Sequence, residues 1–180
     1  MQIAVMLFEG FAALDAVGPY DALARVPGAH VIFAAERVGP VSSESGRLAL
    51  VADAVLSEIP HPDVLVVPGG SGRRRHMSNG PLHQWMRGAD ATSRWTIGVG
   101  EGTLLLAAAG PLHGRRAASK PGALSLELVG HGAIPVGDMF TFDGKYATAA
   151  DGSAALGLGV ELARRIRAAV PQDHERIGIR

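Results

Sequence analysis

The sequence contains no cysteine among its 180 residues. Disulfide bonds, thiolate metal sites, iron–sulfur clusters and catalysis by a cysteine nucleophile are therefore all excluded. The same absence leaves the redox compartment undetermined. Any chemistry that this protein performs is performed without a thiolate.

An excess of charge is also missing, because 17 Lys and Arg residues balance 17 Asp and Glu residues. No basic stripe with interleaved aromatic residues is present, so nucleic acid is not an expected partner. The short basic run Arg73-Arg74-Arg75-His76 is expected to be a solvated loop, as isolated runs of charge usually are.

Long apolar runs are absent as well. No stretch approaches the length that a bilayer span requires, so we expect no membrane association. The N-terminal residues lack a basic start and reach Glu9 too early for a secretory signal peptide. We therefore expect a cytoplasmic location.

Signatures of metal and nucleotide binding are missing too. The histidines show no metal-ligand spacing on one face; they stand at positions 30, 61, 76, 83, 113, 131 and 174. The glycine-rich residues 69–72 lack the lysine and the Ser or Thr of a phosphate-binding P-loop. The sequence thus predicts no metal site and no cofactor.

What the chain does have is the composition and pattern of a globular α/β protein. With 180 residues, 47% of them apolar, it is long enough for one domain with a substantial core, which we place at residues 1–180. Apolar runs predict strands at residues 3–8, 30–35, 63–67 and 96–99, and an Asp-Gly turn predicts a hairpin of residues 139–142 with 145–149. Residues 48–51 are expected in a hairpin or a short added strand.

Helical spacing of apolar residues follows most of these strands. It predicts helices at residues 82–89, with Pro81 in the first turn, and at 103–109, 122–129 and 156–169, the last with Leu158, Leu162 and Ile166 facing inward. Apolar residues also recur at helical spacing around Pro19, so a helix is expected to begin near this proline or to bend there. Alternating strands and helices predict a three-layer sandwich with a mostly parallel central sheet.

Residues 95–110 predict a short buried strand, a glycine turn and an apolar helix. A strand–turn–helix of this kind, which we call the elbow, places its middle residue at the top of a parallel sheet on a strained backbone. That middle residue is Gly100, which has no side chain, and Glu101 follows it at the start of the helix. Hydrolysis through a covalent intermediate is therefore disfavoured.

Four loops follow predicted strands and can converge on one pocket, because ligands of such sheets bind outside the carboxyl ends of the strands. These loops are residues 9–10, 68–72, 98–102 and 149–153.

A set of motifs then runs in order over almost the whole chain: FEGF at 8–11, LDAVGP at 14–19, VLVVPGGSG at 64–72, LLLAAAG at 104–110, LHGRRA at 112–117 and the hairpin ending in TAA at 148–150. With these motifs the chain resembles the ThiJ/PfpI family, in its isonitrile hydratase-like branch. The resemblance implies a flavodoxin-like, class I glutamine-amidotransferase-like fold. It also implies a homodimer formed through the helices that flank the elbow.

The sequence departs from the family pattern mainly at the expected pocket. The resembled enzymes carry a cysteine followed by a threonine at the elbow, where this chain has Gly100 and Glu101. Lys120 stands where a histidine often follows the Arg-Arg-Ala segment, and Asp151 stands where glycine is usual. Asp15 matches the carboxylate that lies beside the cysteine in the resembled enzymes and handles protons.

Two carboxylates, Asp15 and Glu101, are therefore expected in one semi-apolar pocket. Burial raises the pKa of both and repulsion raises one further, so one can hold a proton while the other accepts one. General acid–base catalysis near neutral pH requires this. The amides of Glu101 and Gly102 at the helix N-terminus, with that of Gly70 by resemblance, would hold developing negative charge.

The sequence thus predicts a cofactor-free, cysteine-independent lyase or cyclase in specialised metabolite biosynthesis. It would act on a carbonyl-containing small molecule by dehydration, conjugate addition or isomerisation, with Glu101 moving the proton and Asp15 assisting. The expected substrate-binding residues are Gly70, Gly100, Gly102 and Asp151.

Other interpretations stay open. Glu101 could serve only as a partner of the helix dipole, Asp15 as a helix cap, and Asp151 as a turn residue. Lys120 is expected to be a solvated lysine and not a base. At the level of function, the alternatives are a non-catalytic relative that binds a ligand or protein partner, and a divergent isonitrile hydratase-like hydro-lyase.

Overall fold

The computed structural model describes residues 1–169, and a seven-stranded sheet with the order β10-β11-β7-β6-β1-β2-β5 forms its centre. Every strand pair in it is parallel except β10 with β11. The strands are β1 Gln2–Met6, β2 His30–Ala35, β5 Ala54–Val55, β6 Val64–Val67, β7 Trp95–Val99, β10 Phe140–Asp143 and β11 Tyr146–Ala149. All four residues of β6 are buried, as expected for a strand covered on both faces.

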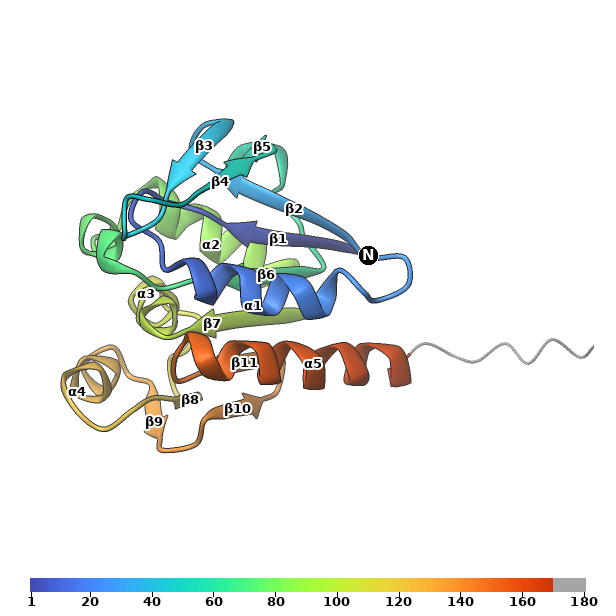
Figure 1. The fold of residues 1–180 in the computed structure, drawn as a ribbon. Helices are drawn as coiled ribbons and strands as arrows, with labels where there is room; N and C mark the ends of the chain where they lie inside the picture. The colour runs from blue at the N-terminus through green and yellow to red at the C-terminus, as the bar shows by residue number, and fades with distance from the viewer. Residues whose placement is uncertain (170–180) are drawn as a thin grey trace, which may run out of the picture.

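Helices cover both faces of this sheet. Figure 1 shows α1 (Ala13–Leu23) and α5 (Gly152–Ala169) side by side in front of it and α2 (Pro81–Thr92) behind it. The elbow helix α3 (Glu101–Ala109) contacts α2 and β7. The predicted three-layer α/β sandwich is therefore confirmed.

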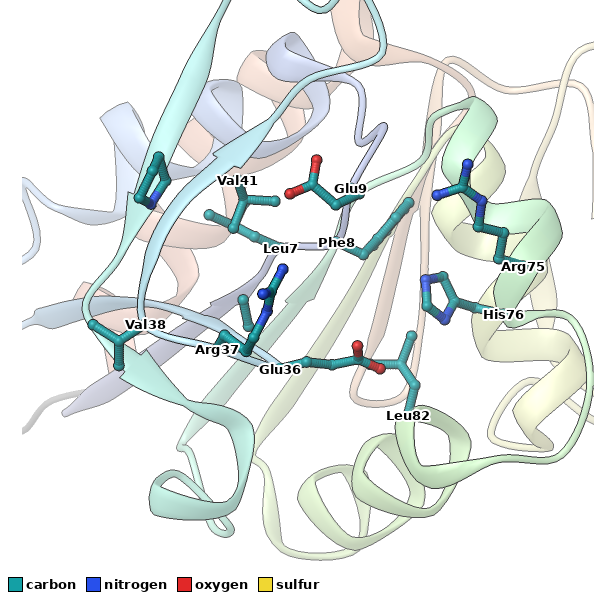
Figure 2. Close-up of a pocket in the computed structure, with 12 residues that line it drawn as sticks. Leu7, Phe8, Glu9, Glu36, Arg37, Val38, Val41, Arg75, His76 and Leu82 are labelled. Atoms are coloured by element: carbon teal, nitrogen blue, oxygen red, sulfur yellow. The ribbon is translucent and has the colours of Figure 1, made fainter.

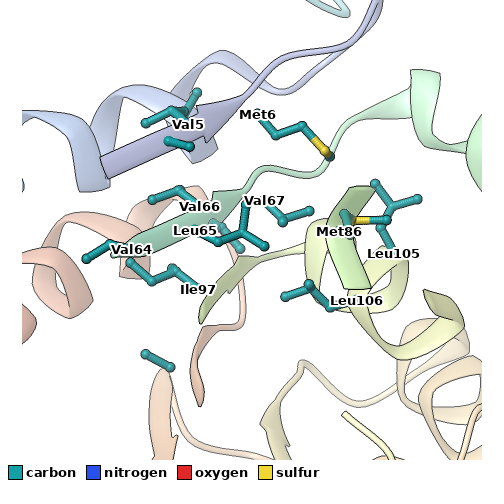
Figure 3. Close-up of a cluster of buried hydrophobic side chains, with 14 of the residues drawn as sticks. Val5, Met6, Val64, Leu65, Val66, Val67, Met86, Ile97, Leu105 and Leu106 are labelled. Carbon is teal, nitrogen blue, oxygen red and sulfur yellow. The ribbon is translucent and has the colours of Figure 1, made fainter. Parts of the chain in front are cut away.

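The core lies on both faces of the central strands. Figure 3 shows Met6 and Val67 on the side of Met86, Leu105 and Leu106, whereas Val5 and Val64 lie on the opposite side, and all of these side chains are fully buried. The continuous apolar runs in the sequence supply the strands, and removing their surface from water is the main force that holds the layers together.

The helix around Pro19 begins earlier than the sequence predicted. It starts at Ala13 and carries Pro19 inside it, six residues beyond the first. Proline removes one intrahelical hydrogen bond, whose acceptor would be the carbonyl of Asp15 four residues back. Packing of α1 against α5 outweighs this loss, so the expectation of a helix start near Pro19 is wrong.

The remaining elements agree with the expectations to within a few residues at their ends. Residues 48–51 contribute to β4 (Ala49–Ala52), which forms a hairpin with β3 (Gly39–Ser42). Leu158, Leu162 and Ile166 of α5 are buried, as predicted.

Sequence patterns did not predict a small parallel pair of strands, β8 (Arg116–Ala118) and β9 (Ile134–Val136), which come before and after α4 (Ala123–Gly130) in the chain. Two short 3-10 helices, η1 (Leu56–Glu58) and η2 (Ser71–His76), were likewise not predicted.

Two glycines allow α1 and α5 to approach closely. A Cβ added at Gly159 would lie 3.0 Å from the Ala22 Cβ, and one added at Gly18 would lie 3.2 Å from the Leu156 nitrogen. This close packing sets the loop before α5 against the first turns of α1. Within residues 1–169, no helix is both long enough and apolar enough to cross a membrane. The single-domain assignment over residues 1–180 stays a prediction.

Candidate functional site

Asp15 lies in the first turn of α1 and is only 6% exposed. Its Oδ2 accepts a hydrogen bond of 3.0 Å from the amide of Gly69, in the loop after β6. The position before the helix is occupied by Ala12, and no side chain caps α1. Asp15 therefore joins two segments far apart in the sequence, and the alternative that it caps its own helix is wrong.

Three glycines from three loops surround this carboxyl group. A Cβ built at Gly69 or at Gly100 would lie 2.8 or 3.0 Å from Oδ2, and one at Gly152 would lie 2.6 Å from Oδ1. The loops after β6, β7 and β11 thus reach Asp15 with backbone alone. The predicted convergence of loops on one site is found at this carboxyl group.

Burial raises the pKa of Asp15 from 3.8 to about 6. The hydrogen bond from Gly69 opposes this rise because it favours the carboxylate, whereas the negative charges of Glu44, Asp151 and Glu101 add to it. Asp15 is therefore a buried acid that changes protonation state within the range in which most enzymes operate.

The elbow itself has the backbone that its sequence predicted. Strand β7 ends at Val99, helix α3 begins at Glu101, and Gly100 between them has φ +54° and ψ −125°. An L side chain rarely adopts this conformation, and a Cβ here would point at Asp15. Gly100 therefore lets the elbow backbone approach the Asp15 carboxyl closely.

Glu101 makes an ion pair that the sequence did not indicate. Its Oε1 lies 2.9 Å from Nη2 of Arg73, a side chain that is 11% exposed, while the Glu101 side chain is 41% exposed. Arg73 also lies 3.7 Å from Glu127 of α4, and its Nε is buried without a hydrogen-bond partner among the described residues. The expectation that the basic run is a solvated loop holds for Arg74 and Arg75 and is wrong for Arg73.

Asp151 stands at the start of α5 and is held by three groups. The Lys120 ammonium forms an ion pair with Oδ2, while the Ser153 hydroxyl (2.5 Å) and the Ala154 amide (3.0 Å) donate to Oδ1. The hydrogen bond from Lys120, followed by those from Ser153 and Ala154, holds the pKa of Asp151 well below its usual range. Asp151 therefore caps α5 beside the site, and Lys120, 71% exposed, is largely solvated as expected.

Gly70 and Gly102 are positions of close backbone approach. A Cβ at Gly70, where φ is +123°, would lie 2.4 Å from the Gly10 oxygen, and one at Gly102 would lie 2.1 Å from the Val67 oxygen. No side chain caps α3, so the first-turn amides of Glu101 and Gly102 have neither an intrahelical nor a side-chain partner. These amides stay candidates for binding negative charge.

A hollow of about 350 Å³ opens on one side of Asp15. Leu14, Ser43, Glu44 and Ser153 also line it, whereas Glu101 does not. Sequence reasoning missed Arg73 and Glu44. The charge run contained Arg73 but could not show which arginine turns inward, and the serine-rich loop around Glu44 carried no motif at all.

Among residues 1–169, no three His, Asp or Glu side chains are arranged as metal ligands. His174, one of the seven histidines of the sequence, lies outside the described residues.

Comparison with known proteins gives consistent matches. The DJ-1/PfpI family profile matches residues 1–165. The chain is 34% identical over 166 residues to an isonitrile hydratase from Pseudomonas putida, covering 92% of this chain and 72% of that enzyme. It is 30% identical over 125 residues to the HTH-type transcriptional regulator CdhR from Pseudomonas aeruginosa, covering 69% of this chain and 37% of the regulator. A ThiJ/PfpI family protein from Pseudomonas syringae superposes with a TM-score of 0.83 at 29% identity, covering 99% of this chain and 78% of its own.

Proposed function

Since the chain belongs to the DJ-1/PfpI family, we propose that it is a cysteine-independent hydro-lyase in which Asp15 exchanges the proton. It would add water to a polar multiple bond of a small molecule, or remove it. One observation carries this proposal: a buried carboxyl group with a pKa of about 6, bordered by three glycines and lining a hollow of about 350 Å³. A relative at 34% identity is an isonitrile hydratase, which supports hydration as the reaction class.

The proposed step needs only groups that the chain supplies. As a carboxylate, Asp15 takes a proton from water while the water oxygen bonds to the electrophilic carbon of the substrate. As a carboxylic acid, it then returns that proton to carbon: to the attacked carbon of an isonitrile, whose imidic acid tautomerises to the formamide, or to the α-carbon of an α,β-unsaturated carbonyl compound. Atoms and charge balance without an oxidant or reductant, and the reverse sequence is dehydration. A group that titrates near the working pH suits both directions.

The contacts favour a different division of roles from the one the sequence suggested. Glu101 was expected to move the proton, but its carboxylate faces the Arg73 guanidinium at 2.9 Å, whereas Asp15 accepts a hydrogen bond from the Gly69 amide and, within residues 1–169, makes no ion pair. We propose that Asp15, and not Glu101, is the residue that transfers the proton. Glu101, held by Arg73, would orient the substrate next to the first-turn amides of α3, which would bind negative charge that develops on it.

Gly100 makes room for this substrate. In the family pattern a side chain occupies this position, and here a Cβ would lie only 3.0 Å from Oδ2 of Asp15, so the glycine removes that contact. The substrate is then a small isonitrile or an α,β-unsaturated carbonyl compound, because both add water at carbon with proton transfer to a neighbouring atom or to the same carbon. Conjugate addition and isomerisation, which need the same proton transfer, stay predictions. A role in specialised metabolism also stays a prediction.

The experiment compares turnover by wild type, Asp15→Asn and Glu101→Gln, with Asp21→Asn as a control on an exposed position of the same helix. The probes are cyclohexyl isocyanide and 2-cyclohexenone, followed by proton NMR for the formamide or the hydrated ketone. Asp15→Asn is expected to lower the rate by about 100-fold or more, as loss of a general acid–base group does. The hydration rate of the wild type should fall as the pH drops below about 6, since Asp15 is then protonated. A full rate in a folded Asp15→Asn protein would refute the mechanism.

A second candidate function is a binding protein without turnover. Two ion pairs at the site, Glu101 with Arg73 and Asp151 with Lys120, favour this alternative, because carboxylates held by cations are poor proton acceptors. In that case the probes would bind without conversion, and Asp15→Asn would leave their affinity unchanged.

A further inference from the structure

A second hollow, of about 430 Å³, shares no lining residue with the hollow beside Asp15. Figure 2 shows the side chains that surround it, and none of them belongs to the elbow or to α1. Its apolar wall is built by Phe8, Val41 and Leu82, which are 4%, 6% and 4% exposed. The volume is in the range of pockets that hold small organic ligands, about 300–1,000 Å³.

Charged side chains of both signs border this apolar wall. Arg37 and Arg75 contribute two cations, and Glu9 and Glu36 contribute two anions. Within residues 1–169, none of these four side chains makes an ion pair, although nine ion pairs occur elsewhere in the same region. Both signs of charge are therefore available to a ligand.

Two of the polar lining groups are held in place. Oε2 of Glu9 accepts a hydrogen bond of 3.2 Å from the amide of Ser42. The His76 ring stands edge-on to the Phe8 ring, with centroids 5.5 Å apart. The backbone carbonyl oxygen of His76 is hydrogen-bonded to Nε2 of His83 at 2.5 Å. A pair of contacting rings thus stands beside a carboxylate that the Ser42 amide holds, an arrangement that suits a flat ligand.

The position of the hollow also fits a binding site. The chain leaves β1 for β2 on one side and later enters β6 on the other side of β1, so β1 stands at the switch point of the sheet. The residues that follow β1 and β2, together with η2 after β6, line the hollow. Ligands of open α/β sheets bind in this crevice outside the carboxyl ends of the strands.

We propose that this hollow, independently of the Asp15 site, binds a small zwitterion with a flat apolar body, of the size and charge of an aromatic amino acid. A ligand that carries only an anion would meet Glu9 and Glu36 without compensation. A ligand that carries only a cation would meet Arg37 and Arg75 in the same way. A ligand with both charges satisfies both sets, and its flat body covers Phe8, Val41 and Leu82.

The test uses three probes with the same ring system: L-tryptophan, indole-3-propionate, which lacks the amine, and tryptamine, which lacks the carboxylate. Their affinities for the full chain are measured by isothermal titration calorimetry. Arg75→Gln removes one cation of the hollow and Glu36→Gln one anion. Arg74→Gln is the matched control, because Arg74 is an exposed neighbour of Arg75 in η2 that does not line the hollow.

L-tryptophan is expected to bind about ten-fold more tightly than either of the other probes, which corresponds to one charged contact. Arg75→Gln should weaken L-tryptophan and indole-3-propionate but not tryptamine. Glu36→Gln should weaken L-tryptophan and tryptamine but not indole-3-propionate, and Arg74→Gln should change none of the three. Absence of binding at millimolar concentration, equal affinity for all three probes, or equal effects of Arg74→Gln and Arg75→Gln would overturn the proposal.

Discussion

Asp15 is buried beside glycines and, within residues 1–169, makes no ion pair with a cation. Enzymes need a carboxyl group of this kind when it must hold and release a proton near neutral pH, and the folded state loses stability by keeping it there. The pKa of about 6 in the folded protein, against 3.8 for the free side chain, is equivalent to about 3 kcal/mol at pH 7. The ionised Asp15 side chain is therefore expected to lower the free energy of unfolding at neutral pH.

The first prediction is that Asp15→Asn stabilises the protein while it abolishes turnover. Because the pKa of Asp15 is raised on folding, its contribution is most favourable below pH 4 and is lost as the pH rises through about 6. At pH 7.5 the variant is expected to gain about 1–3 kcal/mol in the free energy of unfolding, and near pH 4 the gain should vanish. Urea unfolding at both pH values measures this, with Asp21→Asn as control. A loss of stability at pH 7.5 would contradict it.

The second prediction concerns Gly100, where a positive φ coincides with contact to Asp15. Gly100→Ala is expected to cost about 1–3 kcal/mol from backbone strain, and more from the 3.0 Å approach of its Cβ to Oδ2. Gly114→Ala is the control, because Gly114 also has positive φ but has no neighbour within 4 Å. Thermal unfolding compares the two variants. Equal losses would show that the contact with Asp15 adds nothing.

At the scale of elements, helix α5 depends on a residue that the sequence marked as either turn or pocket. The Asp151 carboxylate accepts a hydrogen bond from the amide of Ala154, one of the N–H groups at the start of the helix that have no partner within the helix. The cap holds Gly152 against Asp15, so the same residue stabilises an element and shapes the site.

The third prediction is that Asp151→Ala lowers the free energy of unfolding by about 0.5–2 kcal/mol, the usual effect of losing an N-cap. Asp151→Ser should restore most of this, because a hydroxyl also accepts the amide hydrogen bond. Lys120→Ala should cost less, since ion pairs with exposed partners contribute about 0–1 kcal/mol. Urea unfolding of the three variants at pH 7 is the measurement. If Lys120→Ala cost as much as Asp151→Ala, the ion pair and not the cap would be the main contribution.

The segment η2 shows what element-level prediction from sequence missed. Three consecutive arginines look alike in the sequence, yet Arg73 is nearly buried against Glu101 while Arg74 and Arg75 are exposed. The direction of each side chain follows from the tight 3-10 turn, which is set by the close contact of Gly70 and Gly72 with the loop after β1. No local pattern in the basic run contains that information.

At the scale of the whole molecule, the packing of α1 against α5 brings Asp15 and the loop before α5 together. Gly159 allows this approach, because its Cα faces Ala22 and Pro19 directly. The predicted homodimer through the helices that flank the elbow is a separate question, which light scattering on the purified chain answers.

The fourth prediction is that Gly159→Val lowers the free energy of unfolding by about 1–3 kcal/mol, because the added side chain overpacks the interface of the two helices. A Cβ at this position would already lie 3.0 Å from Ala22. Gly157→Val, at an exposed position two residues earlier, is the control and should cost much less. Thermal unfolding measures both. The same loss in both variants would point to helix propensity and not to the interface.

The layers, the parallel strands and the elbow could be read from the amino-acid sequence alone. Each depends on local patterns: continuous apolar runs for buried strands, helical spacing for the helices, and Gly100 at a turn that requires positive φ. The sequence also shows that no thiolate acts here, since the chain has no cysteine. In contrast, the three glycines around Asp15 and the ion pair of Arg73 with Glu101 are visible only in the three-dimensional fold. Burial and charge pairing are properties of residues that are distant in the chain and meet only when the loops after β6, β7 and β11 converge on one carboxyl group.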